Sequence, residues 1–178
     1  MKYPNSYISY LIEYHATRDY FECHELLEEY WKEHPDDPRS AIWVGLIQLA
    51  VGHYHERRGN RIGASKMYAQ ALKKLHKQAL IDLGLDGEQV VHELSLKHNK
   101  LSSEDSVPYI DMNLTIIDSE LAEQCHKKCT VQGLQWGAAS PMWDESLIHR
   151  HKLRDRSDVI AARAVSAKAK KQKRLDAK

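Results

Sequence analysis

The apolar run at the centre of the chain is the feature that most constrains the fold. It reads I-W-V-G-L-I-Q-L-A-V-G-H-Y-H from Ile42 to His55. At about 100° per residue its apolar side chains lie on nearly every side of a helix, which is typical of a helix buried in a core. Gln48 interrupts the run, which is far shorter than the roughly 20 residues of a membrane span. We therefore predict a central core helix of a soluble protein, from Asp36 or Asp37 to Arg58.

A second helix is predicted over D-Y-F-E-C-H-E-L-L-E-E-Y-W, from Asp19 to Trp31. Asp19 is a favourable N-cap. Its predicted buried face comprises Tyr20, Cys23, Leu26, Leu27, Tyr30 and Trp31, and Glu22 and Glu29 lie on the opposite, solvated side. His24 and Glu28 are one turn apart on the flank of the apolar face, and Glu25 lies at its outer edge.

Two glycines in the central helix predict how the helices cross. Gly45 and Gly52 share one face of it with Gln48 and His55. Glycine inside a helix costs about 0.5–1 kcal/mol relative to alanine, so two on one face indicate the close approach of a neighbour. We predict that the 19–31 helix crosses there and brings its histidine and glutamate toward Gln48 and His55. An unpaired core glutamine would cost roughly 1–3 kcal/mol, which also favours a shared polar cluster.

The predicted polar cluster has a structural and a chemical interpretation. Its members are His24, Glu25, Glu28, Gln48 and His55. The structural interpretation is a set of hydrogen-bonded buried groups. The chemical one is a small-ligand or divalent-metal site, with His24, Glu28 and His55 as candidate metal ligands.

The sequence H-E-L-L-E from His24 to Glu28 resembles the H-E-x-x-H helix of zinc peptidases, in which Glu25 would be the general base. Glu28 replaces the second histidine, however, and the paired E-x-x-H helices of a di-iron bundle are not found. We therefore assign no catalytic residue, and whether the protein is an enzyme stays open.

Three sequence blocks together resemble a known family. They are F-E-C-H-E-L-L-E-E-Y-W (21–31), G-L-I-Q-L-A (45–50) and R-R-G-N-R-I-G-A (57–64). At this spacing they are similar to the bacterial and archaeal family called domain of unknown function 309, over roughly residues 8 to 80. The resemblance implies a small all-helical domain and no established activity. The positions that match the motif are His24, Glu25, Glu28, Trp31, Gly45, Gln48, Arg58, Gly59, Asn60 and Ala64. Trp31, Gly45, Gly52, Arg58, Gly59 and Asn60 form the predicted structural part of the motif.

Helices are also predicted on both sides of these two. One runs from Ser6, as N-cap, to His15, with tyrosines that pack inward and extend their hydroxyls to the rim. Gly59 is the predicted C′ residue of the central helix, and Asn60 caps a helix that continues to about Leu83. Its apolar stripe is predicted to comprise Ile62, Met67, Tyr68, Ala71, Leu72, Leu75 and Ala79.

The chain beyond Leu83 has weaker patterns. A helix is predicted over 88–100, an extended segment that crosses the helices over 109–117, and a helix from Asp118 or Ser119 to about Thr130. The segment 131–143 is predicted to be ordered but irregular, with Trp136 and Trp143 as packing anchors. The alternative there is an exposed aromatic binding patch.

The predicted fold class is all-α: a small bundle of antiparallel helices with a less regular C-terminal extension. We divide the chain into a helical core bundle (1–83), additional helices and an irregular segment packed on it (84–146), and a basic tail (147–178). Low glycine and proline content, 8 and 5 residues, agrees with a helical fold. The N-terminus has no apolar signal core, and the cysteine number is odd, which together favour a cytoplasmic protein with reduced thiols. Zinc at Cys125 and Cys129 would need further ligands that the spacing does not provide.

Charge is divided unevenly along the chain. Residues 150–178 contain 11 Lys and Arg against 3 Asp and Glu, a net charge of +8, which leaves −7 for the rest of a chain whose total is +1. A basic tail of this kind, partly helical or disordered, is a candidate for nucleic-acid binding or for self-association. The main hypothesis is nevertheless a binding or structural helical module without catalysis of its own. A metal-dependent hydrolase or small-ligand site and a nucleic-acid accessory protein are the alternatives, and no partner is identified.

Overall fold

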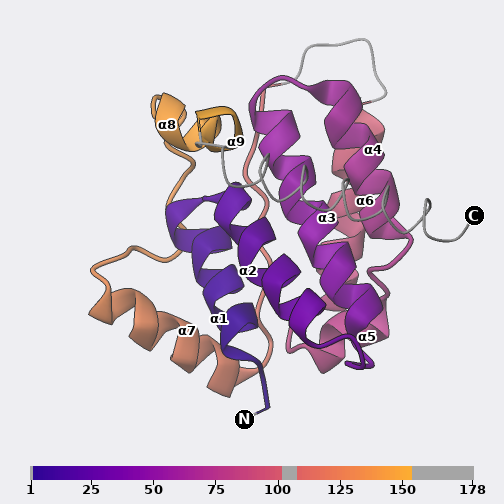
Figure 1. Ribbon diagram of the computed structural model, residues 1–178, viewed down its shortest axis with the longest axis vertical. Coiled ribbons are helices and arrows are strands. Elements are labelled where there is room, and N and C mark those ends of the chain that lie inside the picture. Colours follow the sequence, from indigo (N-terminus) through magenta and orange to yellow (C-terminus); the bar gives the residue numbers. More distant parts are fainter. Residues whose placement is uncertain (1, 102–107, 154–178) are drawn as a thin grey trace, which may run out of the picture. The chain divides into compact units, whose positions relative to one another are not determined.

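The structure is a computed structural model that describes residues 2–101 and 108–153. Within these ranges all regular secondary structure is helical, and an isolated antiparallel bridge joins Leu85 to Ile116 (Figure 1). The predicted all-α class is confirmed. No helix in the described ranges combines the length and the apolar character needed to cross a membrane.

One compact unit extends from Met1 to Ile148. Its helices, in chain order, are α1 (Asn5–Ile12), the π-helix η1 (Glu13–Thr17), α2 (Tyr20–Glu33), α3 (Ser40–Arg57), α4 (Arg61–Leu72), α5 (Lys77–Asp82), α6 (Gly87–Leu101), α7 (Ser119–Val131) and α8 (Glu145–Ile148). A second unit begins at His149, and its described part contains α9 (Arg150–Leu153). Most of the basic tail, residues 154–178, lies outside the described residues, as does the tail-based nucleic-acid or self-association hypothesis.

The central helix is α3, as predicted. Trp43, Leu46, Leu49 and Ala50 have no exposed surface. The helix begins at Ser40 instead of Asp36 or Asp37 because residues 37–40 form a turn, which the backbone N–H of Ser40 closes on the Asp37 carbonyl. The Asp37 carboxylate accepts hydrogen bonds from the backbone N–H of Arg39 and from the Trp43 indole. At the other end Gly59 has φ of +74°, the left-handed conformation expected of a C′ glycine.

The glycine face of α3 receives α4 and the turn after it, so the predicted crossing of α2 at this face is wrong. A Cβ on Gly45 would lie 2.7 Å from Leu75 Cδ2. A Cβ on Gly52 would lie 2.3 Å from Tyr68 Cε1. α2 packs on a different side of α3, where Phe21 and Tyr54 have ring centroids 6.5 Å apart. Both glycines do permit the close approach of a neighbour, but a helical wheel does not say which neighbour it is.

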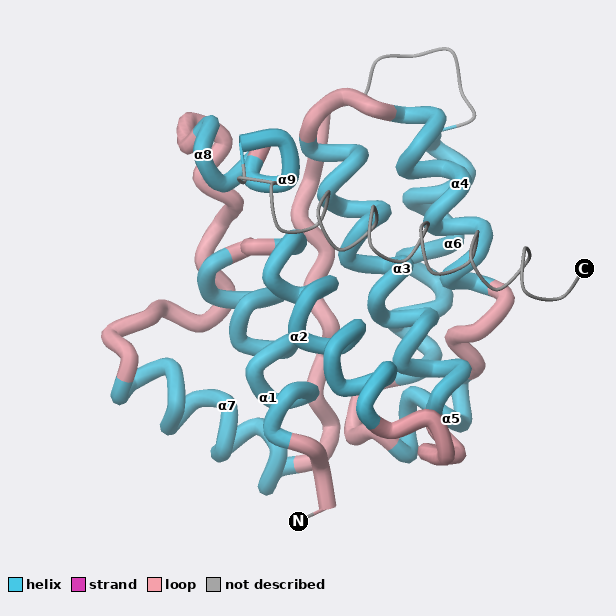
Figure 2. The backbone as a smooth tube through the Cα atoms, in the orientation of Figure 1, coloured by secondary structure: helices cyan, strands magenta, loops and turns pink. Residues whose placement is uncertain are grey.

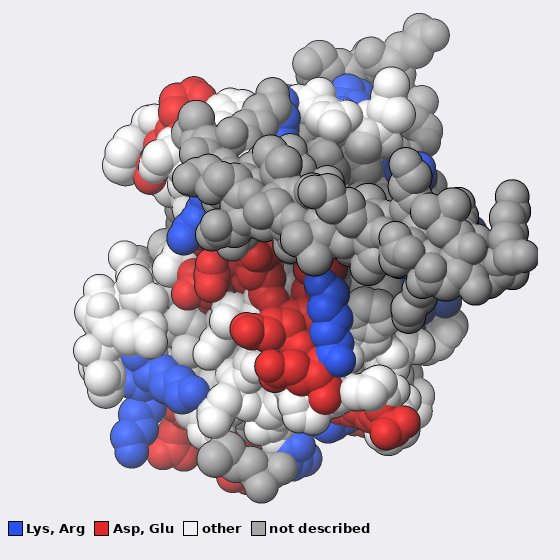
Figure 3. Space-filling view, in the orientation of Figure 1, with Lys and Arg blue, Asp and Glu red and all other residues white. Residues whose placement is uncertain are grey.

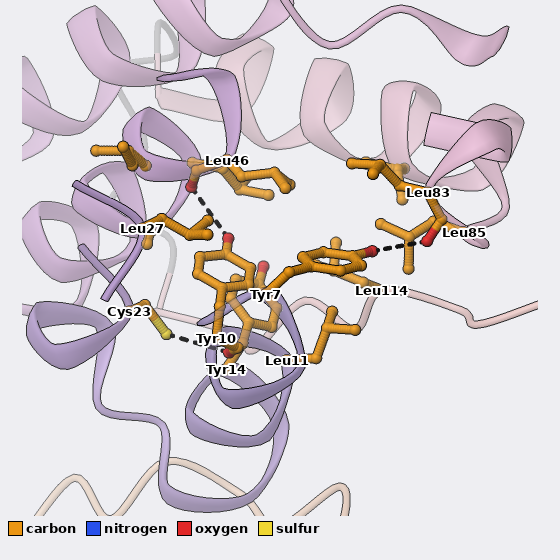
Figure 4. Close-up of a cluster of buried hydrophobic side chains, with 14 of the residues drawn as sticks. Tyr7, Tyr10, Leu11, Tyr14, Cys23, Leu27, Leu46, Leu83, Leu85 and Leu114 are labelled. Atoms are coloured by element: carbon orange, nitrogen blue, oxygen red, sulfur yellow. Dashed lines mark hydrogen bonds between the residues drawn. The ribbon is translucent and has the colours of Figure 1, made fainter. Parts of the chain in front are cut away.

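The tyrosines of the first helix lie deeper than predicted. Tyr7, Tyr10 and Tyr14 have no exposed surface. Figure 4 shows the Tyr7 hydroxyl donating to the carbonyl of Leu83 and the Tyr10 hydroxyl donating to the carbonyl of Leu46. The hydroxyls of Tyr7 and Tyr10 therefore bond backbone acceptors inside the core and do not reach the rim. The predicted Ser6 cap is also wrong, because α1 starts one residue earlier after Pro4, and the segment after α1 is a π-helix.

The helix predicted from Asn60 to Leu83 is divided into α4 and α5. The break at residues 73–76 lets Leu75, 1% exposed, fill the space beside Gly45. The predicted apolar stripe is wrong at Ile62, which is 86% exposed. The packing of Leu75 against α3 thus interrupts a helix that the sequence pattern predicts to be continuous.

The extended segment after residue 108 crosses the helices as predicted (Figure 2). Met112 and Leu114 are buried, and Asp118 caps α7 by accepting from the backbone N–H of Leu121. Trp136 is partly buried, as expected of an anchor. Trp143 is 83% exposed, so its predicted role as a packing anchor is wrong.

Asn60 caps α4 through its side-chain oxygen, which accepts from the backbone N–H of Gly63 at 3.0 Å. We expect Asn60→Ala to lower the free energy of unfolding by about 1 kcal/mol, because an N–H of the first turn loses its acceptor. Asn60→Asp keeps the acceptor and should cost much less. Urea unfolding of the three proteins measures the difference, and equal losses for the two variants would contradict the cap assignment.

Candidate functional site

His24, Glu25 and Glu28 form a compact group on α2, which we call the α2 group. Nδ1 of His24 lies 3.0 Å from Oε1 of Glu25, and Nε2 lies 3.7 Å from Oε2 of Glu28. One ligand atom from each residue can be chosen so that all three lie within 4.8 Å of one another. The side chains are 25%, 34% and 33% exposed, so the group is partly buried near the surface.

The local sequence fixes the α2 group in place. Asp19 caps α2 by accepting from the backbone N–H of Glu22 at 3.0 Å. Cys23 and Leu27, on the core face, have no exposed surface. Because this face is anchored, the neighbouring flank that carries the group cannot rotate. Figure 3 shows acidic side chains gathered over α2, and Lys32 bonds Glu28 at 3.1 Å.

An unpaired nitrogen distinguishes the α2 group from an ordinary surface ion pair. Nδ1 of His24 is buried and has no hydrogen-bond partner among the described residues, although a Glu25 oxygen lies 3.0 Å away. The distance is short enough for a hydrogen bond, but the angle between the two groups is unsuitable for one. Imidazole nitrogen and carboxylate oxygen are the donor atoms that zinc and manganese accept in proteins. The arrangement can therefore supply three adjacent ligand atoms to one divalent cation.

The other two members of the predicted cluster lie in different settings. His55 accepts a hydrogen bond from the Asn60 amide at 3.1 Å, at the start of α4. Among the described residues, the group able to hold a metal consists of the three α2 side chains and does not include His55. Gln48 is partly buried, and its Oε1 has no hydrogen-bond partner in the described part of the chain.

The remaining motif residues have structural contacts. The Trp31 indole donates to the Ser40 hydroxyl at 2.7 Å, which joins the end of α2 to the start of α3. Arg58 donates to the Tyr54 hydroxyl at 3.1 Å and lies over its ring.

A buried hydrogen-bonded chain around His53 was not predicted from the sequence. His53 has no exposed surface. Its Nε2 lies 2.9 Å from the Tyr14 hydroxyl, and its Nδ1 lies 3.1 Å from the Tyr109 hydroxyl. Tyr109 donates to Tyr20 at 2.9 Å, and Tyr20 donates to Asp111 at 3.1 Å. We call these five residues the His53 chain.

Counting donors assigns the tautomer of His53. Tyr109 uses its one hydroxyl proton on Tyr20, so it must accept from His53. Nδ1 therefore carries the proton, and Nε2 accepts from Tyr14. Burial lowers the pKa of His53 well below its usual 6.5, which keeps the ring neutral as this assignment requires.

The chain ends on a carboxylate that stays charged. Burial on its own would raise the pKa of Asp111, but hydrogen bonds from the hydroxyl and backbone N–H of Ser140 lower it below the usual 3.8. Each hydroxyl of the His53 chain thus donates one hydrogen bond, and the series of bonds ends on the Asp111 carboxylate. The His53 chain joins the segment around Tyr109 to the helices and therefore has a structural role.

Two buried arginines lie beside the His53 chain. Arg18 is 1% exposed and has φ of +58°, a left-handed conformation that is uncommon outside glycine. It donates to the carbonyls of Tyr14, Met112 and Ala138 and to the Asn113 side chain. Arg57 is 5% exposed and donates to the carbonyl of Arg18 at 2.7 Å.

One signal in the sequence could have found His53. A helix that is apolar on nearly every side buries whatever polar residue it contains, and His53 stands within such a helix between Gly52 and Tyr54. The distant partners, Asp111 and Ser140, carry no comparable signal.

The cysteines offer no metal site in the described residues. Cys23, Cys125 and Cys129 are free and buried. Burial raises the pKa of Cys125 to about 12, so its thiol stays protonated and is a poor ligand.

The family follows from comparison with known proteins. Residues 7–67 match the family model described as domain of unknown function (DUF309). The chain is 42% identical over 174 residues to "Uncharacterized protein YpuF" of Bacillus subtilis (strain 168). The aligned region covers 97% of this chain and 99% of that protein. The chain belongs to the DUF309 family. The family model covers most of α1, all of η1, α2 and α3, and the first part of α4, and therefore includes the α2 group and His53. No solved structure matches the chain.

Proposed function

We propose that this member of the DUF309 family is a non-catalytic binding module that holds a divalent metal ion at the α2 group. The observation that carries the proposal is the closeness of three ligand atoms, one from each side chain, within 4.8 Å. A single ion bound to all three would bond both carboxylates and the His24 nitrogen that has no hydrogen-bond partner among the described residues.

The geometry favours binding over hydrolysis. An oxygen of Glu25 lies 3.0 Å from the histidine, where it can bind the same ion, whereas peptidase chemistry would use this residue as a base beside a metal held by other groups. Three ligands on one turn of a surface helix leave coordination positions open, so water or a group from a partner would complete the shell.

We also propose a cytoplasmic location, which agrees with the three free cysteines.

Calorimetric titration of the tag-free protein with zinc and with manganese tests this site. We expect one ion per chain, and His24→Ala should weaken its affinity at least about tenfold, since losing a direct ligand should cost no less than losing a supporting group. Glu28→Gln should have a similar effect, because an amide oxygen is a weaker ligand than a carboxylate.

His92 supplies a matched control. It is an exposed histidine on α6 followed by Glu93, so it repeats the His-Glu pair but has a leucine where α2 has Glu28. His92→Ala should bind metal like the wild type. Equal loss in the His92 and His24 variants, or no binding by the wild type, would reject the site.

A further inference from the structure

Arg57 is held rigidly at the end of α3. Its Nη1 donates to the carbonyl of Arg18 at 2.7 Å and to the Ser140 hydroxyl at 3.4 Å. Its guanidinium carbon lies 4.8 Å from the centroid of the Tyr20 ring. The side chain is therefore fixed by contacts from the start of α2 and from the irregular segment before α8.

The opposite edge of this guanidinium is unpaired. Nε and Nη2 of Arg57 are both buried, and neither has a hydrogen-bond partner among the described residues. These two nitrogens lie on the same edge of the planar group and present two parallel N–H donors. Leaving charged donors unpaired inside a protein is costly. Arg18, by contrast, uses all three of its side-chain nitrogens in hydrogen bonds.

Nearby carboxylates already have other partners. Asp111 accepts from Tyr20 and Ser140, and Asp144 accepts from the backbone N–H of Leu147 and from Ser146. In the ranges that the structure describes, no carboxylate lies within salt-bridge distance of Arg57. The Nε–Nη2 edge of Arg57, which we call its fork, is thus fixed and charged, and no carboxylate of the described residues is paired with it.

We propose that the Nε–Nη2 edge of Arg57 is a binding site for a small oxyanion, either a carboxylate or a phosphate. Two parallel N–H donors match two oxygens of such a group, and this bidentate arrangement is the strong form of arginine recognition. The segment from residue 132 to 144 has no helix or strand, and it contacts Arg57 through Ser140. Local opening of this segment at Ser140, beyond the Ala138 carbonyl that bonds Arg18, would admit a small ion. This site is independent of the α2 group.

Side-chain NMR of the full chain tests the site directly. The Nε–H signal of Arg57, assigned by its loss in Arg57→Lys, should shift and saturate when sodium phosphate or sodium acetate is added at constant ionic strength. The Nε–H signal of Arg18, already bonded to the Ala138 carbonyl at 2.7 Å, is the internal control and should move little. Sodium chloride should shift neither signal. A shift with one salt only would identify that chemistry as the ligand. An Arg57 signal that stays fixed with both, up to tens of millimolar, would overturn the proposal.

Charge-conserving variants separate the fork from general attraction. Arg57→Lys keeps the positive charge but loses the fork, so anion affinity measured by thermal stabilisation should fall at least about tenfold. Arg58→Lys changes the neighbouring, partly exposed arginine in the same way and should bind like the wild type. Equal affinities in Arg57→Lys and the wild type would reject the site. Should Arg57→Lys fail to fold, the wild-type titration still decides the question, with the Arg57 signal assigned through the backbone.

Discussion

Replacing Gly52 with alanine is expected to lower the free energy of unfolding by roughly 2 kcal/mol, the range of overpacking effects in well-packed cores. The new methyl group would lie 2.3 Å from Tyr68 Cε1 and 2.4 Å from Cδ1. Tyr68 cannot easily withdraw, because it has no exposed surface and its hydroxyl donates to Glu56 at 2.6 Å. This clash should outweigh the gain in helix propensity of about 1 kcal/mol.

Two comparisons make the Gly52 prediction specific, both measured by urea unfolding. Gly45→Ala should cost less, because its closest contact is the end of the flexible Leu75 side chain. In a Tyr68→Ala background the ring is gone, so Gly52→Ala should become neutral or stabilising. If Gly52→Ala were equally harmful with and without the ring, the close approach of α4 would not be the reason for this glycine.

Acidification should destabilise the protein through His15, even before carboxylates begin to protonate. His15 is 1% exposed, its Nδ1 lies 2.8 Å from the Leu11 carbonyl, and its Nε2 accepts from the backbone N–H of Leu114. Burial lowers its pKa from 6.5 to about 4. Between these values the unfolded chain binds a proton that the folded chain excludes, so the free energy of unfolding falls as pH decreases. From pH 7.5 to 5 the loss from this histidine is roughly 2 kcal/mol.

The loss from His15 reaches roughly 3 kcal/mol at pH 4 and is complete only below that pH. His53, whose pKa is also lowered by burial, adds to the same trend. Urea unfolding between pH 7.5 and 5 should therefore show a slope that His15→Asn reduces, although this variant starts from lower stability. His92→Asn, at an exposed position on α6, should keep the wild-type slope. An unchanged slope in His15→Asn would mean that the His15 ring is not the group whose protonation the folded state disfavours.

Much of the fold could be predicted from local patterns. The core position of α3, the burial of Tyr20, Cys23 and Leu27 on α2 and the caps at Asp19 and Asn60 depend on residues within one or two turns of one another. The predicted face of α2 also included Leu26, Tyr30 and Trp31, which are only partly buried, and it missed the buried Phe21. Helical periodicity and capping act over this range, so the sequence shows them directly. The adjacency of His24, Glu25 and Glu28 belongs to the same class, because i, i+1 and i, i+4 spacing on one helix is enough to define it.

Contacts between distant segments were decided by tertiary packing alone. Which helix lies against Gly45 and Gly52, where the helix after Asn60 breaks, and which acceptors the buried tyrosines meet all depend on shape complementarity between elements far apart in the chain. The His53 chain joins Tyr14 to Asp111, and the paired edge of Arg57 reaches Ser140. No local pattern specifies such partners, because a buried polar group accepts any neighbour with suitable geometry, and only the folded chain supplies one.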